Sequence, residues 1–215
     1  MNESTTKEKV LKKVRDALVN KMPPPYESVD LEKSVYAAPD SEFPDVAFAE
    51  AFSKVKGDFV YCADYIELSN SVLALLRQKK VSSLFCCENL FDGLINVNDI
   101  ICQKDIKDIE TCQAAITSCE VLISRLGTVV MSSRQGSGRN GAVITPLHIV
   151  VATSRQLVWD IKDALAFLNK KYDGVLPSMV TFITGPSRTA DIEKSLVIGA
   201  HGPKELYVFL VESQP

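Results

Sequence analysis

Hydrophobic residues in this chain come in short, uniform runs that alternate with stretches of helical periodicity. Runs with the length and composition of buried strands lie at residues 58–63, 81–87, 147–154, 179–184 and 206–212. Apolar residues at helical spacing follow the first run, at 65–76, and precede the fourth, at 161–168. Strands that are apolar throughout are usually covered on both faces. The alternation therefore predicts an α/β fold with three layers around a mainly parallel sheet.

Other segments add to this plan. A helix is expected at residues 5–20, because Thr5 and Glu8 have the spacing of a capping box. A second helix is expected at 109–118, and a β-hairpin at 121–131.

A proline-rich stretch divides the chain. Residues 21–45 carry five of the ten prolines and show little periodicity, which predicts an extended arm. We therefore expect two parts: an N-terminal helix with its proline-rich arm at residues 1–44, and one compact domain at 45–215.

Composition and charge exclude several classes of protein. The 215 residues include 24 basic and 27 acidic side chains, with no run of more than three basic residues, so nucleic-acid partners are not expected. The first residues are charged and no window of about eighteen residues is uniformly apolar, which predicts a cytoplasmic protein without a membrane span. None of the six cysteines stands in a C-x-x-C pair, so we expect packed thiols and neither a metal site nor a cofactor.

Polar residues gather directly after the predicted strand 179–184. The chain should turn at Gly185, and a helix is expected to begin near Thr189. Free backbone amides, the positive end of the helix dipole and Arg188 would then favour a carboxylate or a phosphate. The predicted anion-binding residues are Gly185, Ser187, Arg188 and Thr189. The alternative is a helix that is capped by its own residues, with Arg188 paired to an acid of the first turn.

A glycine-rich loop at residues 132–141 is the second candidate for anion binding. Its backbone, together with Arg134 and Arg139, could wrap a phosphate, although it matches neither a Walker loop nor a dinucleotide-binding fingerprint. The alternative is a mobile loop in solvent.

The chain has two histidines in different surroundings. His148 lies inside the apolar run 147–154 and is expected to be a hydrogen-bonded core residue. His201 lies in a glycine-flanked loop before the last strand, where it could reach the same edge of the sheet as Arg188. With Glu193 as a nearby acid, His201 is the candidate for proton transfer.

Two segments near the end of the chain carry a family signature: GPSRTADIE at residues 185–193 and GAHGPKELYVFLV at 199–211. The segments LGTVVMSS, at 126–133, and TPLHIVVATSRQLV, at 145–158, precede them. In these motifs the chain resembles the LUD-domain family, in its lactate utilization protein C (LutC, YkgG) branch, over residues 48–211.

The resemblance implies a fold similar to the NagB/RpiA/CoA transferase-like superfamily and a part in the oxidation of L-lactate to pyruvate. It also implies partner proteins that carry iron–sulfur clusters, whereas this chain lacks their cysteine motifs and is expected to hold no cluster. The chain departs from the family at Arg125 and Leu126, where a polar or acidic residue and a threonine are common.

Three functions are compatible with these features. The first is an accessory component of lactate oxidation that binds a small anionic metabolite at Ser187, Arg188 and Thr189, with Arg139 closing over it. The second is a non-catalytic scaffold that docks an iron–sulfur oxidoreductase through the proline-rich arm. The third, an isomerase or ligase acting on a sugar phosphate or a folate, follows from the implied fold alone.

Overall fold

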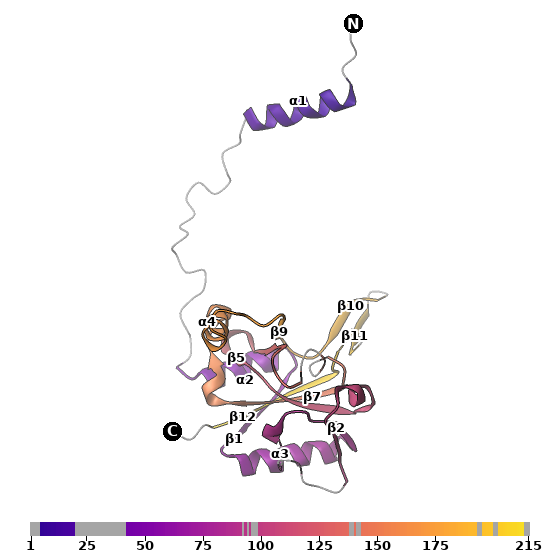
Figure 1. The fold of residues 1–215 in the computed structure, drawn as a ribbon, viewed down its shortest axis with the longest axis vertical. Coiled ribbons are helices and arrows are strands. Elements are labelled where there is room, and N and C mark those ends of the chain that lie inside the picture. Colours follow the sequence, from indigo (N-terminus) through magenta and orange to yellow (C-terminus); the bar gives the residue numbers. More distant parts are fainter. Residues whose placement is uncertain are drawn as a thin grey trace. The chain divides into compact units, whose positions relative to one another are not determined.

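A computed structural model gives the fold of the chain (Figure 1). It describes residues 5–19, 42–91, 93, 95, 99–137, 140, 143–192, 195–199 and 202–212. The chain divides into two units, Met1–Ala38 and Pro39–Pro215.

The first unit contains helix α1, Thr6–Val19. As the sequence predicts, a capping box starts this helix: the Thr5 amide donates to Glu8 Oε2 at 2.8 Å, and the Glu8 amide donates to Thr5 Oγ1 at 3.4 Å. None of its side chains is buried.

A six-stranded parallel sheet forms the centre of the second unit. In spatial order its strands are β1 (Asp58–Cys62), β12 (Glu205–Val211), β7 (Leu147–Thr153), β4 (Ala114–Ser118), β2 (Ser83–Phe85) and β3 (Ile101–Gln103). Every neighbouring pair in this sheet is parallel. The predicted α/β fold with a mainly parallel sheet is thus confirmed.

A smaller sheet lies over one face of the large one (Figure 1). It contains β8 (Leu157–Val158), β5 (Val121–Ile123), β6 (Thr128–Ser132) and β9 (Val180–Ile183). The antiparallel pair β5 and β6 confirms the predicted hairpin at 121–131. The predicted strand at 179–184 also exists, but it pairs antiparallel with β6 and does not join the parallel sheet.

Helices cover both faces of the large sheet. On one face, helix α3 (Tyr65–Gln78) packs Leu68 and Val72 against Ile149 and Phe209 of the sheet. On the other face, α2 (Pro44–Lys54) packs against the two sheets through side chains that are fully buried, Phe48 and Phe52. Helix α4 (Ile161–Lys171) packs on the smaller sheet. Among the described residues, no helix is long and apolar enough to cross a bilayer.

The helix predicted at 109–118 is wrong. Residues Ile106–Thr111 form a short 3-10 helix, and Ala114–Ser118 after it form strand β4. This strand lies between β7 and β2 in the sheet, and both of its faces are buried, with Ala114 and Ile116 in one apolar cluster and Ala115 in another. A segment of five residues, AAITS, is too short for its pattern to distinguish a central strand from a piece of helix.

Candidate functional site

A cavity lies where strands β4 and β7 end. Its volume is about 240 Å³. Ligands of open parallel sheets usually bind beyond the carboxyl ends of the strands, which is where this cavity opens. The sheet contributes Ser118, Val151, Ala152 and Thr153; the other lining residues are Tyr65, Leu68, Phe91, Cys119, Gln156 and Lys171.

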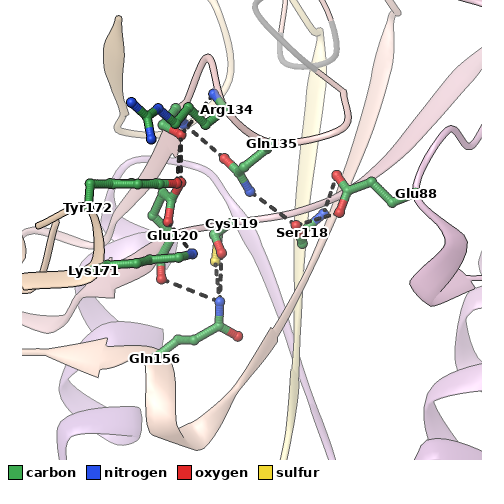
Figure 2. A network of polar contacts seen from close by, with 10 residues as sticks. Glu88, Ser118, Cys119, Glu120, Arg134, Gln135, Gln156, Lys171 and Tyr172 are labelled. Carbon is green, nitrogen blue, oxygen red and sulfur yellow. Dashed lines mark hydrogen bonds and ion pairs between the residues drawn. The ribbon is translucent and has the colours of Figure 1, made fainter. Parts of the chain in front are cut away.

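The carboxylate of Glu120 is the centre of a polar network beside this cavity (Figure 2). Its side chain is 0% exposed. Lys171 Nζ donates to Glu120 Oε2 at 2.7 Å, while the hydroxyls of Tyr172 and Ser132 donate to Oε1 at 2.6 and 2.5 Å. A buried carboxylate needs such partners. Glu120 therefore holds Lys171, the last residue of α4, at the cavity wall.

Lys171 and Glu120 form an ion pair at neutral pH. Burial raises the pKa of Glu120, but the hydrogen bonds from Lys171, Ser132 and Tyr172 outweigh it and leave this pKa below its ordinary value. Burial lowers the pKa of Lys171, yet the bond to Glu120 raises it above its ordinary value overall. The Lys171 side chain is 47% exposed. An ammonium has three N–H groups, so donors remain for a ligand.

Hydrogen bonds link Glu120 to a second carboxylate, Glu88 (Figure 2). The Ser118 hydroxyl donates to Glu88 Oε2 at 2.5 Å and accepts from Gln135 Nε2 at 3.0 Å. Gln135 Oε1 in turn accepts from the amide of Ser132, whose hydroxyl donates to Glu120. These bonds fix the position of Ser118 at the cavity wall.

Gln156 fixes another part of the wall. Its Oε1 accepts from the Thr153 amide at 2.8 Å and from Thr153 Oγ1 at 3.1 Å. Its Nε2 donates to the Cys119 carbonyl at 2.6 Å and approaches Cys119 Sγ at 3.7 Å. Burial raises the pKa of the Cys119 thiol well above its ordinary value, so this thiol stays protonated and is a poor nucleophile.

The predicted helix near Thr189 is wrong. The chain bends at Gly185, with φ of 83°, where a Cβ would lie 2.4 Å from the Val55 carbonyl oxygen. It then forms a hairpin of β10 (Arg188–Ile192) and β11 (Ser195–Ile198). The anion site predicted at Gly185, Ser187, Arg188 and Thr189 thus lacks the helix N-terminus on which it was based.

Two of the groups expected to bind the anion have partners within the chain. The Ser187 amide donates to the Pro203 carbonyl at 2.9 Å. Arg188 Nη2 donates to the Val55 carbonyl at 2.6 Å. Binding of an anion at Ser187 and Arg188 stays a prediction.

The glycine-rich loop brings one predicted residue to the network around Glu120. The Arg134 guanidinium carbon lies 4.9 Å from the ring centroid of Tyr172, and the Arg134 amide donates to Ser132 Oγ at 3.2 Å (Figure 2). Three other predicted residues, Arg139, Glu193 and His201, lie outside the described residues. Within the described ranges, no group of three or more His, Cys, Asp or Glu side chains could hold a metal ion.

The sequence-based prediction did not include Ser118, Glu120 or Lys171. Had residues 114–118 been predicted as a parallel strand, Ser118 and Glu120 would have stood at its carboxyl end, where ligands of such sheets bind. Lys171 gives a weaker signal, because a basic residue in the last turn of a helix usually interacts with the helix dipole.

Comparison with known proteins gives a consistent result. The model of the LUD domain matches residues 47–211. Lactate utilization protein C of Geobacillus sp. (strain WCH70) is 33% identical over 113 residues, which cover 51% of this chain and 47% of that protein. Lactate utilization protein C of Bacillus subtilis (strain 168) is 32% identical over 114 residues, 52% of this chain and 48% of that protein. The matches thus span about half the length of these relatives.

A solved structure supports the fold. The crystal structure of a DUF162 family protein from Deinococcus radiodurans superposes with a TM-score of 0.60 and covers 80% of this chain and 99% of that one. At 19% sequence identity this likeness concerns the fold alone.

Proposed function

The chain belongs to the LUD-domain family, and from this premise we propose that it serves lactate utilization by binding a small carboxylic acid in the cavity beside Lys171. It would act in the cytoplasm as an accessory component of the oxidation of L-lactate to pyruvate. The names of its relatives support the pathway. The cavity at the end of β4 supports the binding site.

The observation that carries this proposal is the fixed ammonium of Lys171. Its bond to buried Glu120 holds it at the wall while its side chain stays half exposed. Arg134, stacked on Tyr172, adds a second positive charge close to the same carboxylate. Lys171 and Arg134 balance the two carboxylates of the network, Glu120 and Glu88. Among the described residues that line the cavity, Lys171 is the charged one, so its free N–H groups favour the carboxylate of a ligand.

Removing the Lys171 charge tests the proposal. Lys171→Met keeps the apolar stem and should weaken binding of L-lactate or pyruvate by roughly 10- to 150-fold, the range for a charge-assisted hydrogen bond. Isothermal titration calorimetry on the full chain measures the affinity. Lys170→Met removes the same charge from the preceding, exposed residue and is the matched control.

Arg188→Ala separates this site from the one that the sequence predicts. If the acid binds beside Lys171, Arg188→Ala should leave the affinity for the acid unchanged. An affinity that falls in Arg188→Ala and persists in Lys171→Met would move the site to the β10–β11 hairpin and refute the proposal.

A second candidate function is supported by helix α1. Val10, Leu11, Val14 and Leu18 form an apolar stripe on it, and each of them is at least 43% exposed. Five basic and two acidic residues give this helix a net charge of +3, whereas the whole chain carries −3. An exposed stripe between basic residues suits a groove with acidic borders on a partner protein. We propose that partner to be an iron–sulfur protein of lactate oxidation.

A further inference from the structure

The hydroxyl groups of Ser118 and Thr153 at the cavity wall already donate their protons to partners within the chain. Ser118 Oγ donates to Glu88 at 2.5 Å, and Thr153 Oγ1 donates to Gln156 Oε1 at 3.1 Å. A hydroxyl has one proton and two lone pairs. Each oxygen also accepts one hydrogen bond: Ser118 Oγ from Gln135 Nε2, and Thr153 Oγ1 from the backbone N–H of Gln156. Both oxygens therefore keep one free lone pair and no free proton.

Gln156 offers a ligand little more. Its Oε1 accepts two hydrogen bonds from Thr153. Its Nε2 donates to the carbonyls of Cys119 and Glu120, at 2.6 and 3.4 Å. The hydrogen-bonding groups of the Gln156 side chain are therefore all occupied by partners within the chain. The protonated Cys119 thiol is at most a weak donor.

Among the described side chains that line the cavity, Lys171 is thus the strong charged donor, and Ser118 Oγ and Thr153 Oγ1 are acceptors. Tyr65 also lines the cavity, but it is 55% exposed, so water can satisfy its hydroxyl. The rest of the lining is apolar and buried: Leu68, Phe91, Val151 and Ala152.

Building on the proposed function, we infer that this cavity selects 2-hydroxy acids over the corresponding 2-oxo acids. The carboxylate of either acid accepts from Lys171. The 2-hydroxyl of the reduced acid can donate a hydrogen bond to Ser118 or Thr153. The 2-oxo group of the oxidised acid has no proton to donate, so its lone pairs would face the lone pairs of these two oxygens. The alkyl group of either acid packs on the apolar lining, so it does not distinguish the two.

The experiment compares matched pairs of acids on the full chain by isothermal titration calorimetry. The pairs are L-lactate with pyruvate, and 2-hydroxyisovalerate with 2-oxoisovalerate. In each pair the hydroxy acid should bind roughly tenfold more tightly, the factor expected for one net hydrogen bond. In Ser118→Ala and Thr153→Val this preference should shrink towards one. Affinity for the oxo acid should be kept in both variants, which shows that they are folded.

The outcomes separate this inference from the proposed function. If both members of a pair bind equally and both are lost in Lys171→Met, the selectivity is refuted and the proposed function stands. If no acid binds, or binding ignores Lys171, both fail. A preference that survives Ser118→Ala and Thr153→Val but disappears in Tyr65→Phe would also refute the assignment to the two wall oxygens.

Discussion

His148 shows what one buried titratable residue does to the stability of this fold. Its Nε2 lies 2.8 Å from Thr117 Oγ1 on the neighbouring strand, and its side chain is fully buried in β7. The hydrogen-bonded core histidine that the sequence predicts is therefore confirmed. Within the described structure its Nδ1 has no hydrogen-bond partner. Burial lowers the pKa of His148 from 6.5 to about 4, so the ring is neutral at pH 7.

This histidine should make the stability fall in weak acid. The unfolded chain binds a proton at His148 near pH 6.5, whereas the folded chain does so only near pH 4, so protons favour unfolding between these values. Over this window the free energy of unfolding should drop by up to about 3 kcal/mol on account of His148. Below pH 4 both states are protonated and the contribution stops changing.

Urea unfolding at a series of pH values measures this slope. His148→Gln removes the titration and keeps a polar partner for Thr117, so the difference in slope between wild type and variant isolates the histidine. Carboxylates elsewhere act in both proteins and cancel. Parallel stability curves between pH 4 and 6.5 would contradict the prediction.

At the scale of elements, the sequence predicts helices and strands best where their apolar pattern is continuous. Helices α1, α3 and α4 and strands β1, β7 and β12 lie where the apolar pattern predicts them. The errors concern short segments whose structure depends on distant partners. Strand β4 exists because β7 and β2 pair with it on both sides, and β10 because Arg188 pairs with Ile198 and Thr189 with Val197. Because residues 109–118 were predicted as a helix, the candidate site was not predicted either: Ser118 is the last residue of β4, and Glu120 lies just after it.

Two helix caps of the same type should differ in strength. Asp160 caps α4 and Asp64 caps α3, each by accepting backbone N–H groups of the first turn. Asp160 also accepts a bidentate pair from Arg125, Nε at 3.0 Å and Nη2 at 2.8 Å, with only 9% of its side chain exposed. Replacing it removes a cap and leaves part-buried Arg125 without this carboxylate.

We therefore expect Asp160→Ala to lower the free energy of unfolding by about 2–4 kcal/mol and Asp64→Ala by about 1 kcal/mol. Urea unfolding at pH 7 measures both, and Asp64→Ala is the matched control because it loses the cap alone. Equal losses would mean that the pair with Arg125 contributes nothing. The departure from the family at Arg125 would then have no structural consequence for α4.

At the scale of the whole molecule, positive charge is concentrated in one helix. Helix α1 carries +3, so the remaining residues carry −6. The LUD domain match begins at residue 47, after the unit that contains α1. We propose that residues 1–44 are an appendage for partner binding and that residues 45–215 form the ligand-binding domain. This division separates the two proposed activities, so each can be removed without the other.

Deletion of residues 1–44 should abolish co-purification with the iron–sulfur partner and leave acid binding beside Lys171 unchanged, because the described residues that line that cavity lie between Tyr65 and Lys171. Leu11→Ser with Leu18→Ser should weaken partner binding by at least about tenfold, since the apolar stripe supplies the contact area. Lys12→Ser with Asp16→Ser is the matched control: it changes the opposite face of the helix without altering the net charge and should have little effect. Equal losses in both double variants would show that helix formation or charge, and not the stripe, determines binding. Stronger binding to anionic vesicles than to the protein partner would instead assign α1 to a membrane surface.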